Sequence, residues 1–301
     1  MRRKLPSTAA LAAFEAAARH QSYTRAASEL AVTQSAICRQ IASLEDFLGV
    51  QLFRRSQRGV ALTEAGQRYS RRVAARLDEV ERDALDLMSG GEEGGGSLEL
   101  AVVPTFATQW LLPRLGDFQR QHPGITLHFT PRTRPFLFTD TPFDAAILPG
   151  SEPWPGTESI DLLPEPLVAV ASPHLPGAQA CCSAEDVARL PLLQASTRPD
   201  GWRQWFASLG LAVEHDMAGP RMELFSMLSE AAAQGLGVAL VPRLLVESDL
   251  ASGRLVVLLP HPHASGRSYR LIYPPHKADG PLLQALAGWL TGQAAAYRAQ
   301  A

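Results

Sequence analysis

The sequence predicts two parts of different fold class: an all-α head that ends in one long helix, and an α/β body of two lobes. Apolar residues recur at spacings of three and four through the first 90 residues, which indicates amphipathic helices. Residues 90–97, GGEEGGGS, have the composition of a flexible hinge. After this hinge, short apolar runs alternate with helical patterns, which is typical of βαβ units and a mostly parallel sheet.

Length and composition suit a globular chain of about two domains. The 301 residues are 46% hydrophobic and 19% charged. No apolar run reaches the roughly 18 residues that span a bilayer. The alanine-rich start is interrupted by Glu15 and Arg19, unlike a signal peptide. We therefore expect a cytoplasmic protein with no membrane partner.

The charge is unevenly distributed along the chain. The net charge of −2 combines a balance of +5 in residues 1–60 with −6 beyond residue 90. A basic head on an acidic body suits a polyanionic partner for the head alone.

The three cysteines predict neither a disulfide framework nor a metal site. Cys38, Cys181 and Cys182 form no CxxC pair, and their number is odd. The vicinal pair Cys181-Cys182 could act as a redox sensor, but a reactive thiol needs an electropositive setting that the sequence does not show.

The head begins with three predicted helices. Ser7 caps the first, Thr24 caps a short second helix that runs to Leu30, and Thr33 caps a third that ends at Gly49. The link of residues 31–32 is short enough to make the last two helices cross steeply, as in a helix-turn-helix.

The third helix has two distinct faces. Ile37, Ile41, Leu44 and Leu48 share one face. The leading face opposite carries Gln34, Ser35, Cys38 and Arg39. One face can therefore pack on a small domain while the other enters a DNA groove.

A hairpin and a long helix complete the head. QLFRRSQRGVALT alternates apolar residues around a polar loop with Arg54, Arg55 and Arg58, so residues 1–62 read as a winged helix-turn-helix. Thr63 then caps a helix over residues 63–89, whose apolar stripe runs from Tyr69 to Leu87. We expect this stripe to pair with a second copy of the chain; the alternative is a helix that folds back on its own domain.

The body, residues 98–301, contains strands predicted at 98–104, 125–129, 143–148, 166–173, 237–242 and 269–275. Two strands near 160–168 and 262–270 would cross between the lobes. Lobe I then covers about 98–163 and 268–301, and lobe II about 164–267. A cleft between such lobes, at the carboxyl ends of strands, is where small ligands bind.

Over its whole length the chain resembles the LysR-type transcriptional regulators. The most specific motif is SYTRAASELxVTQSAICRQIxxLExxLGVxLFxR over residues 22–55, followed by RGVxLTEAG over 58–66. The body matches in LPRL, HPGI, FDAAI, AAxxGLGVALVP and LASGRL. FATQWLLPRL, RPDGWRQWF and FSML are most similar to the glycine-cleavage-activator subgroup.

The resemblance implies a DNA-binding head, a periplasmic-binding-protein-like effector domain, and a dimer through the linker helix that assembles into a homotetramer. Double-stranded promoter DNA would be read by Thr33, Gln34, Ser35, Cys38, Arg39, Arg55 and Arg58. Gln matches an adenine edge and Arg a guanine. The family usually has serine at position 38, and cysteine is a weaker donor.

Family members bind a small-molecule effector between the lobes, at the loop after the first strand of the body. Here that loop leads into a helix with a hydroxyl cap, a natural site for a carboxylate. The expected effector residues are Thr105, Phe106, Ala107, Thr108, Arg132, Thr133, Gln194, Ser196, Phe225 and Ser226. In the alternative interpretation the Thr and Ser residues only cap helices and Phe225 is core. Segment 130–142 departs from the family, which usually places a helix there.

Two other classes of function were weighed. An enzyme is disfavoured because the sequence has no GxSxG, HExxH or CxxC motif, and no GxGxxG after a strand. His261, His263 and His276 suit a loop better than a metal site, so we expect no catalytic residue, metal or cofactor. A small-molecule-binding module with a vestigial DNA-binding head is the other alternative, which the arginines of the head argue against.

Overall fold

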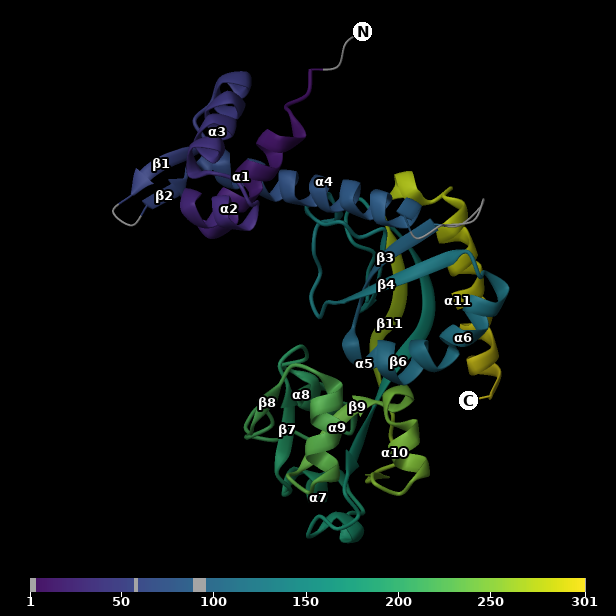
Figure 1. Cartoon of the computed structure of the whole chain (residues 1–301). Coiled ribbons are helices and arrows are strands. Elements are labelled where there is room, and N and C mark those ends of the chain that lie inside the picture. The colour runs from purple at the N-terminus through teal and green to yellow at the C-terminus, as the bar shows by residue number, and fades with distance from the viewer. Residues whose placement is uncertain (1–3, 57–58, 89–95, 301) are drawn as a thin grey trace. The chain divides into compact units, whose positions relative to one another are not determined.

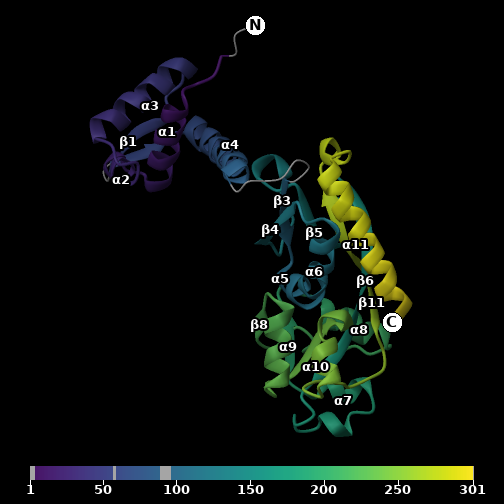
Figure 2. The same cartoon turned by 45° about the vertical axis from the view of Figure 1, so that its right-hand side comes forward.

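The computed structural model describes residues 4–56, 59–88 and 96–300. The chain forms two compact units: residues 1–91 with 136–142, and residues 92–135 with 143–301. Figures 1 and 2 show the elements of both. The first unit contains α1 (Thr8–His20), α2 (Tyr23–Glu29), α3 (Gln34–Leu48), β1 (Phe53–Ser56), β2 (Gly59–Leu62), α4 (Glu64–Met88) and a short 3-10 turn (Phe138–Asp140).

The caps of the first unit follow the sequence with one exception. Ser7 and Thr33 accept the N–H of the residue three positions on, and Gly49 ends α3 in the left-handed region at φ 68°. The prediction that Thr24 caps the second helix is wrong. Ser22 is extended and its hydroxyl accepts the Arg25 N–H, so α2 begins at Tyr23.

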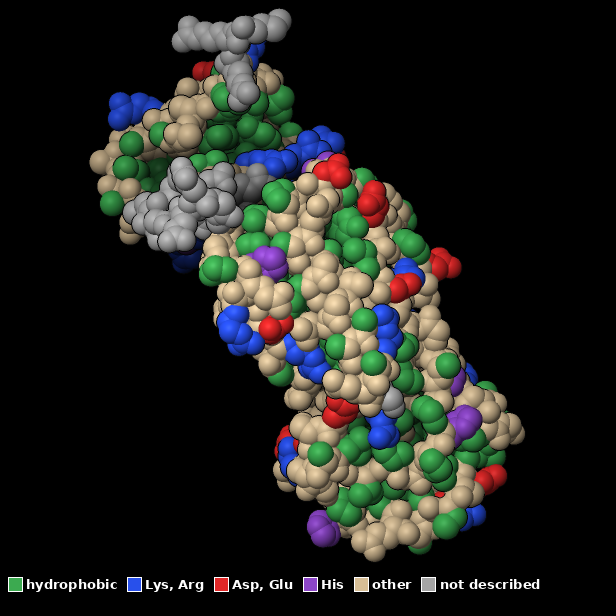
Figure 3. Space-filling view, turned by 90° about the vertical axis from the view of Figure 1, so that its right-hand side faces the viewer, with side chains coloured by type: hydrophobic (Ala, Val, Ile, Leu, Met, Phe, Trp, Pro, Cys, Tyr) green, Lys and Arg blue, Asp and Glu red, His purple; other side chains and the backbone are tan. Residues whose placement is uncertain are grey.

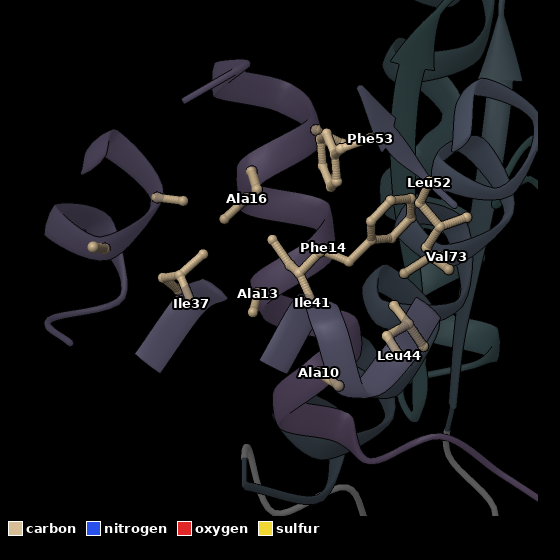
Figure 4. Close-up of a cluster of buried hydrophobic side chains, with 14 residues drawn as sticks. Ala10, Ala13, Phe14, Ala16, Ile37, Ile41, Leu44, Leu52, Phe53 and Val73 are labelled. Carbon is tan, nitrogen blue, oxygen red and sulfur yellow. The ribbon is translucent and has the colours of Figure 1, made fainter. Parts of the chain in front are cut away.

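The core of the first unit lies where α1, α3 and the hairpin meet. Phe14 of α1 is fully buried and packs edge-on against Phe53 of β1, with 5.6 Å between ring centroids. Ile37, Ile41 and Leu44 are at most 2% exposed, as their shared face predicts (Figure 4). Burying this face leaves the opposite face of α3 to solvent.

The stripe of α4 divides between two environments. Tyr69, Val73 and Leu77 pack against the core of the helix-turn-helix, so this half folds back on its own domain. Val80 is 61% exposed. The folded-back alternative therefore holds for the first half of the stripe, and a surface for a second copy remains only beyond Leu77.

Gly66 allows α4 to approach the hairpin. The Thr63 N–H donates to the Leu52 carbonyl, and a Cβ added at Gly66 would lie 2.1 Å from that oxygen. Thr63 caps the same turn by accepting the Gly66 N–H. A glycine at this position therefore fixes where the long helix leaves the domain.

We predict that Gly66→Ala destabilises the first unit by about 1–3 kcal/mol, the usual penalty of overpacking. All five tryptophans lie in the second unit. Thermal melts of the full chain should therefore show helical circular dichroism lost at a lower temperature with the tryptophan transition unchanged. Gly288→Ala, where a Cβ meets no atom within 4 Å, is the control. Equal melting of Gly66→Ala and wild type would contradict this account.

The second unit is an α/β domain. Its strands are β3 (Gly96–Val102), β4 (Ile125–Pro131), β5 (Ala145–Gly150), β6 (Glu158–Ala171), β7 (Leu192–Ala195), β8 (Arg221–Met222), β9 (Val238–Pro242), β10 (Val256–Val257) and β11 (His263–Tyr273). Its helices are α5 (Pro104–Phe106), α6 (Leu112–Gln121), α7 (Ala184–Ala188), α8 (Gly201–Ser208), α9 (Phe225–Ala233), α10 (Glu247–Ala251) and α11 (Pro281–Gln300).

The strand order is β4-β3-β5-β11-β6-β9-β7-β8, and β10 also pairs with β6. β3 is parallel to β4 and β5, and β7 to β8 and β9, as βαβ units require. The expectation of a mostly parallel sheet is wrong at its centre. There β6 and β11 run antiparallel to each other and to β9 and β5, because each crosses once between the halves of the unit.

The crossing strands are irregular where they pass between the halves. The pairing of β11 with β6 shifts register between Ala264 and Ser268, opposite Pro166 and Pro164. β5 pairs with β11 only from Ser268 onward. Proline lacks the N–H that a ladder needs, so this short stretch carries few backbone bonds. Within the described residues, none of the helices is both long and apolar enough to cross a membrane.

Candidate functional sites

The leading face of α3 is open to solvent. Gln34, Ser35, Cys38 and Arg39 are all exposed. The Thr33 hydroxyl caps the helix by accepting the Ala36 N–H and lies 3.0 Å from the Ser35 hydroxyl. A helix that buries Ile37 and presents polar side chains at its first turns has the geometry of a groove-reading helix.

The hairpin presents arginines beside this helix. β1 and β2 pair antiparallel, with Phe53 opposite Leu62, and Arg54 is exposed. The backbone of Arg55 lies in β1. The Arg55 side chain and the whole of Arg58 lie outside the described residues, so their predicted role stays a prediction.

In the second unit, the first helix of the body starts earlier than the sequence indicated. Residues 104–108 were expected to form a loop, but α5 begins at Pro104 and continues through a π-helical turn (Ala107–Leu111) into α6. Proline suits the first helical position because its missing N–H is not needed there. π-helical turns occur often at functional sites. Thr105 therefore lies within a helix.

Thr105 joins this helix to α9. Its side chain is almost fully buried, and its Oγ1 accepts the Ser226 backbone N–H at 3.1 Å. The residue before α9, Leu224, provides no side-chain cap. Thr105 therefore caps α9 from 121 residues away in the sequence.

The residues after Thr105 have mainly structural contacts. Phe106 is fully buried and stacks on Tyr269 at 4.3 Å between ring centroids, and Ala107 is 7% exposed. The exposed Thr108 hydroxyl donates to the carbonyls of Pro104 and Thr105, so it does not cap the helix as expected. These contacts agree with the alternative interpretation for Phe106 and Ala107.

The segment after β4 also reaches the start of α9. The Thr133 hydroxyl donates to the Glu223 carboxylate at 2.5 Å. Arg132 is exposed, and its guanidinium lies 5.1 Å from the centre of the Phe143 ring. Of the two, Thr133 makes the contact with α9.

Gln194 and Ser196 serve the fold around β7 and β8. The buried Gln194 amide donates to the carbonyls of Asp216 and Ala218, at 3.1 and 2.6 Å. The exposed Ser196 hydroxyl donates to the Met222 carbonyl. Gln194 can meet a ligand only by giving up these bonds.

A buried ion pair that the sequence analysis missed lies beside Phe225. Arg198 Nη2 is 3.0 Å from Glu165, whose side chain is fully buried, and its guanidinium lies 5.9 Å from the Phe225 ring centre. Arg198 lies in the quoted RPDGW motif, which was a signal that a ligand arginine might follow β7. Glu165 has only its setting between two prolines to mark it.

Tyr269 of β11 was also missed. Its side chain is fully buried, and among the described residues its hydroxyl and the Arg198 Nε have no hydrogen-bond partner. Burial, and then the negative charge of Glu165, raises the pKa of Tyr269 well above its ordinary value, so the hydroxyl keeps its proton and remains a donor. Buried donors without partners commonly indicate a place for water or a ligand.

The local electrostatics are nearly balanced. Burial, followed by the charge of Arg198, lowers the pKa of Arg267 on β11. Acidic and basic side chains are interspersed over the face of the second unit shown in Figure 3. Specific recognition of charge must therefore come from side chains and helix ends at short range.

The structure offers little support for redox or metal chemistry. Burial, and then Asp186, raises the pKa of Cys181, which is opposite to the change a reactive thiol needs. The described residues contain no group of three or more metal-ligating side chains.

We predict that Thr105→Val destabilises the second unit by about 1–3 kcal/mol, because it leaves the Ser226 N–H without its acceptor. The melting temperature followed by tryptophan fluorescence should fall. Thr105→Ser keeps the hydroxyl and should recover most of the loss. Equal losses in both variants would mean that the methyl group matters and the hydrogen bond does not.

Together, a winged helix-turn-helix and a two-lobed α/β domain define a ligand-responsive DNA-binding regulator. Comparison with known proteins agrees. The family model described as "Bacterial regulatory helix-turn-helix protein, lysR family" matches residues 8–67, and "LysR substrate binding domain" matches residues 91–295.

Curated relatives match over almost the whole chain. The glycine cleavage system transcriptional activator of Escherichia coli (strain K12) is 36% identical over 98% of this chain and 96% of its own length. The HTH-type transcriptional regulator TrpI of Pseudomonas aeruginosa is 36% identical over 98% and 100%.

Solved structures agree on the fold. The effector domain of AmpR of Pseudomonas aeruginosa has a TM-score of 0.62 and 31% identity, and covers 67% of this chain and 97% of that domain. Full-length AphB of Vibrio cholerae has a TM-score of 0.61 at 19% identity, over 94% and 98%.

The chain belongs to the LysR family of transcriptional regulators. It therefore combines a DNA-binding helix-turn-helix with an effector-binding domain of periplasmic-binding-protein-like fold. The enzyme alternative is excluded by this membership, since the relatives are regulators.

Proposed function

We propose that this regulator reads promoter DNA with α3 and the hairpin, under the control of a small anionic effector bound between the lobes. The observation that supports it most is the convergence of Thr105, Ser226, Arg198 and Tyr269 from four separate segments of the second unit. Their donors suit an acid group. The lobes follow the expected division, 98–163 with 268–301, and 164–267.

On the DNA side, Gln34, Ser35, Cys38 and Arg39 would meet bases and phosphates of the major groove. The exposure of all four supports this, as does the cap at Thr33. Arg55 and Arg58 would reach the backbone or minor groove from the wing. One such helix contacts only a few base pairs, so specificity requires repeated copies along the duplex.

On the assembly side, we propose a dimer through the linker helix and a homotetramer in the cytoplasm. The exposed Val80 beyond the packed half of α4 is the observation in favour. Repeating the head along DNA then follows from pairing the helices.

On the effector side, an acid group has three kinds of donor available. These are the N–H groups at the start of α9, the Arg198 Nε and the Tyr269 hydroxyl. The positive end of a helix favours an anion by about 0.3–1 kcal/mol at exposed positions and more when partly buried. The Glu165–Arg198 pair leaves the guanidinium already neutralised, so the effector needs more than charge to bind.

We predict that Arg39→Ala weakens binding to the protein's own promoter region by about 1–3 kcal/mol, the value of one good base contact. Wild-type affinity should also fall steeply with salt, because phosphate contacts release counterions. Fluorescence anisotropy with a promoter duplex at several salt concentrations measures both. Arg120→Ala, on the surface of α6, is the control. Unchanged affinity in Arg39→Ala would favour a vestigial head.

We predict that small carboxylic acids raise the melting temperature of the second unit, whereas amines and sugars without an acid group do not. The acid group gains the donors at α9, Arg198 and Tyr269, and binding to the folded state alone stabilises it. Tryptophan fluorescence in thermal-shift experiments follows this unit. Tyr269→Phe removes one donor and should reduce the shift. Stabilisation by sugars or amines but not by acids would overturn the proposal of an anionic effector.

A further inference from the structure

The start of α9 is held by two hydrogen bonds from the other half of the unit. The Thr105 hydroxyl accepts the Ser226 N–H at 3.1 Å, and the Thr133 hydroxyl donates to Glu223 at 2.5 Å. Thr105 follows β3 and Thr133 follows β4, which are adjacent parallel strands. Both bonds therefore link one strand edge to one helix start.

The two bonds use opposite kinds of group on α9. Ser226 offers a donor, its backbone N–H, and Glu223 offers an acceptor that carries a negative charge. A ligand that enters here and separates the two halves must replace both partners. It must supply an acceptor in place of Thr105 and a donor in place of Thr133.

The charge of Glu223 is not compensated nearby. Glu223 is exposed, and among the described residues its carboxylate has a neutral hydroxyl as hydrogen-bond partner and no ion pair. The neighbouring Arg221 and Arg132 instead donate to the carbonyls of Met217 and Pro131. A plain carboxylate bound at Ser226 would therefore lie close to a second, uncompensated carboxylate, which repels it.

We infer that the effector carries a protonated amine next to its acid group, and that Glu223 binds this amine. The inference rests on the proposed anionic effector and narrows its class to amino acids or compounds with an amino-acid-like end. The ammonium replaces the Thr133 hydroxyl at Glu223. The acid group takes the donors at Ser226, Arg198 and Tyr269.

The buried residues fit this division of charge. Glu165 neutralises Arg198 in a bond that holds both oxygens near one guanidinium nitrogen, at 3.2 and 3.0 Å. With that pair closed, Glu223 carries the charge that a ligand must still balance. A ligand with one positive and one negative group then leaves the site neutral. Charge-assisted hydrogen bonds are also about twice as strong as neutral ones.

The test uses matched compounds on the full-length protein: L-phenylalanine, 3-phenylpropionate and phenethylamine, and L-alanine, propionate and ethylamine. Ligand-observed NMR and thermal shifts give dissociation constants. Wild type should bind an amino acid about tenfold more tightly than its deaminated acid, a difference of about 1.4 kcal/mol. Amines alone should not bind.

Three variants separate the contributions. Glu223→Gln should remove the tenfold preference by weakening amino-acid binding while the plain acid binds as before or more tightly. Thr133→Val should tighten amino-acid binding, since the competing hydroxyl is gone. Glu214→Gln, an exposed carboxylate elsewhere in the same unit, should match wild type.

Several outcomes would overturn the inference. Plain acids that bind wild type as tightly as the amino acids would remove it and leave the anionic effector standing. A tenfold preference that persists in Glu223→Gln would also remove it. If none of the six compounds binds wild type or Glu223→Gln, both the amine and the anionic effector are wrong.

Discussion

The hydrogen bond from the Ser226 N–H to the Thr105 hydroxyl is the contact on which the effector domain depends. A helix leaves its first N–H groups without partners, and α9 has no cap of its own because Leu224 precedes it. Its first turn is completed by a side chain from the other half of the unit. The stability of the helix start and the closeness of the two halves are therefore one quantity.

The strands that join the two halves allow that quantity to vary. Glu165 lies between Pro164 and Pro166 in β6, and opposite it β11 carries an irregular stretch with Gly266 at φ 68°. This stretch is held by side chains, since Ser265 donates its hydroxyl to the Glu165 carbonyl. Few ladder bonds have to break for the halves to turn, whereas the sheets on each side stay regular.

What the sequence could predict follows the range of the interactions involved. Ser7, Thr33 and Gly49 act within one helical turn, and their roles could be predicted correctly. Ser22 and Thr24 are both good caps two residues apart, and only the extended backbone at Ser22 decides between them. The family pattern gave the two-domain fold and the separation of the head from the body.

The effector residues were harder to predict because their partners lie far along the chain. Arg198 meets Glu165 from 33 residues away, and Phe106 stacks on Tyr269 across more than 160 residues. No periodicity or spacing records such pairs. Gln194 shows the converse: a polar residue at the end of a strand looks like a ligand, yet both its donated bonds hold neighbouring loops.

The linker helix shows why one apolar stripe can have two roles. Its first half completes a domain too small to bury its own core, since Tyr69 and Phe14 pack with 5.5 Å between ring centroids. That packing fixes the direction in which α4 leaves the head, and Gly66 permits it. Only the remaining turns are available to a second copy. A ligand can shift the balance between two arrangements only by the difference in its affinity for them. In this chain that difference arises at the start of α9, where a ligand must compete with bonds the protein already makes to itself.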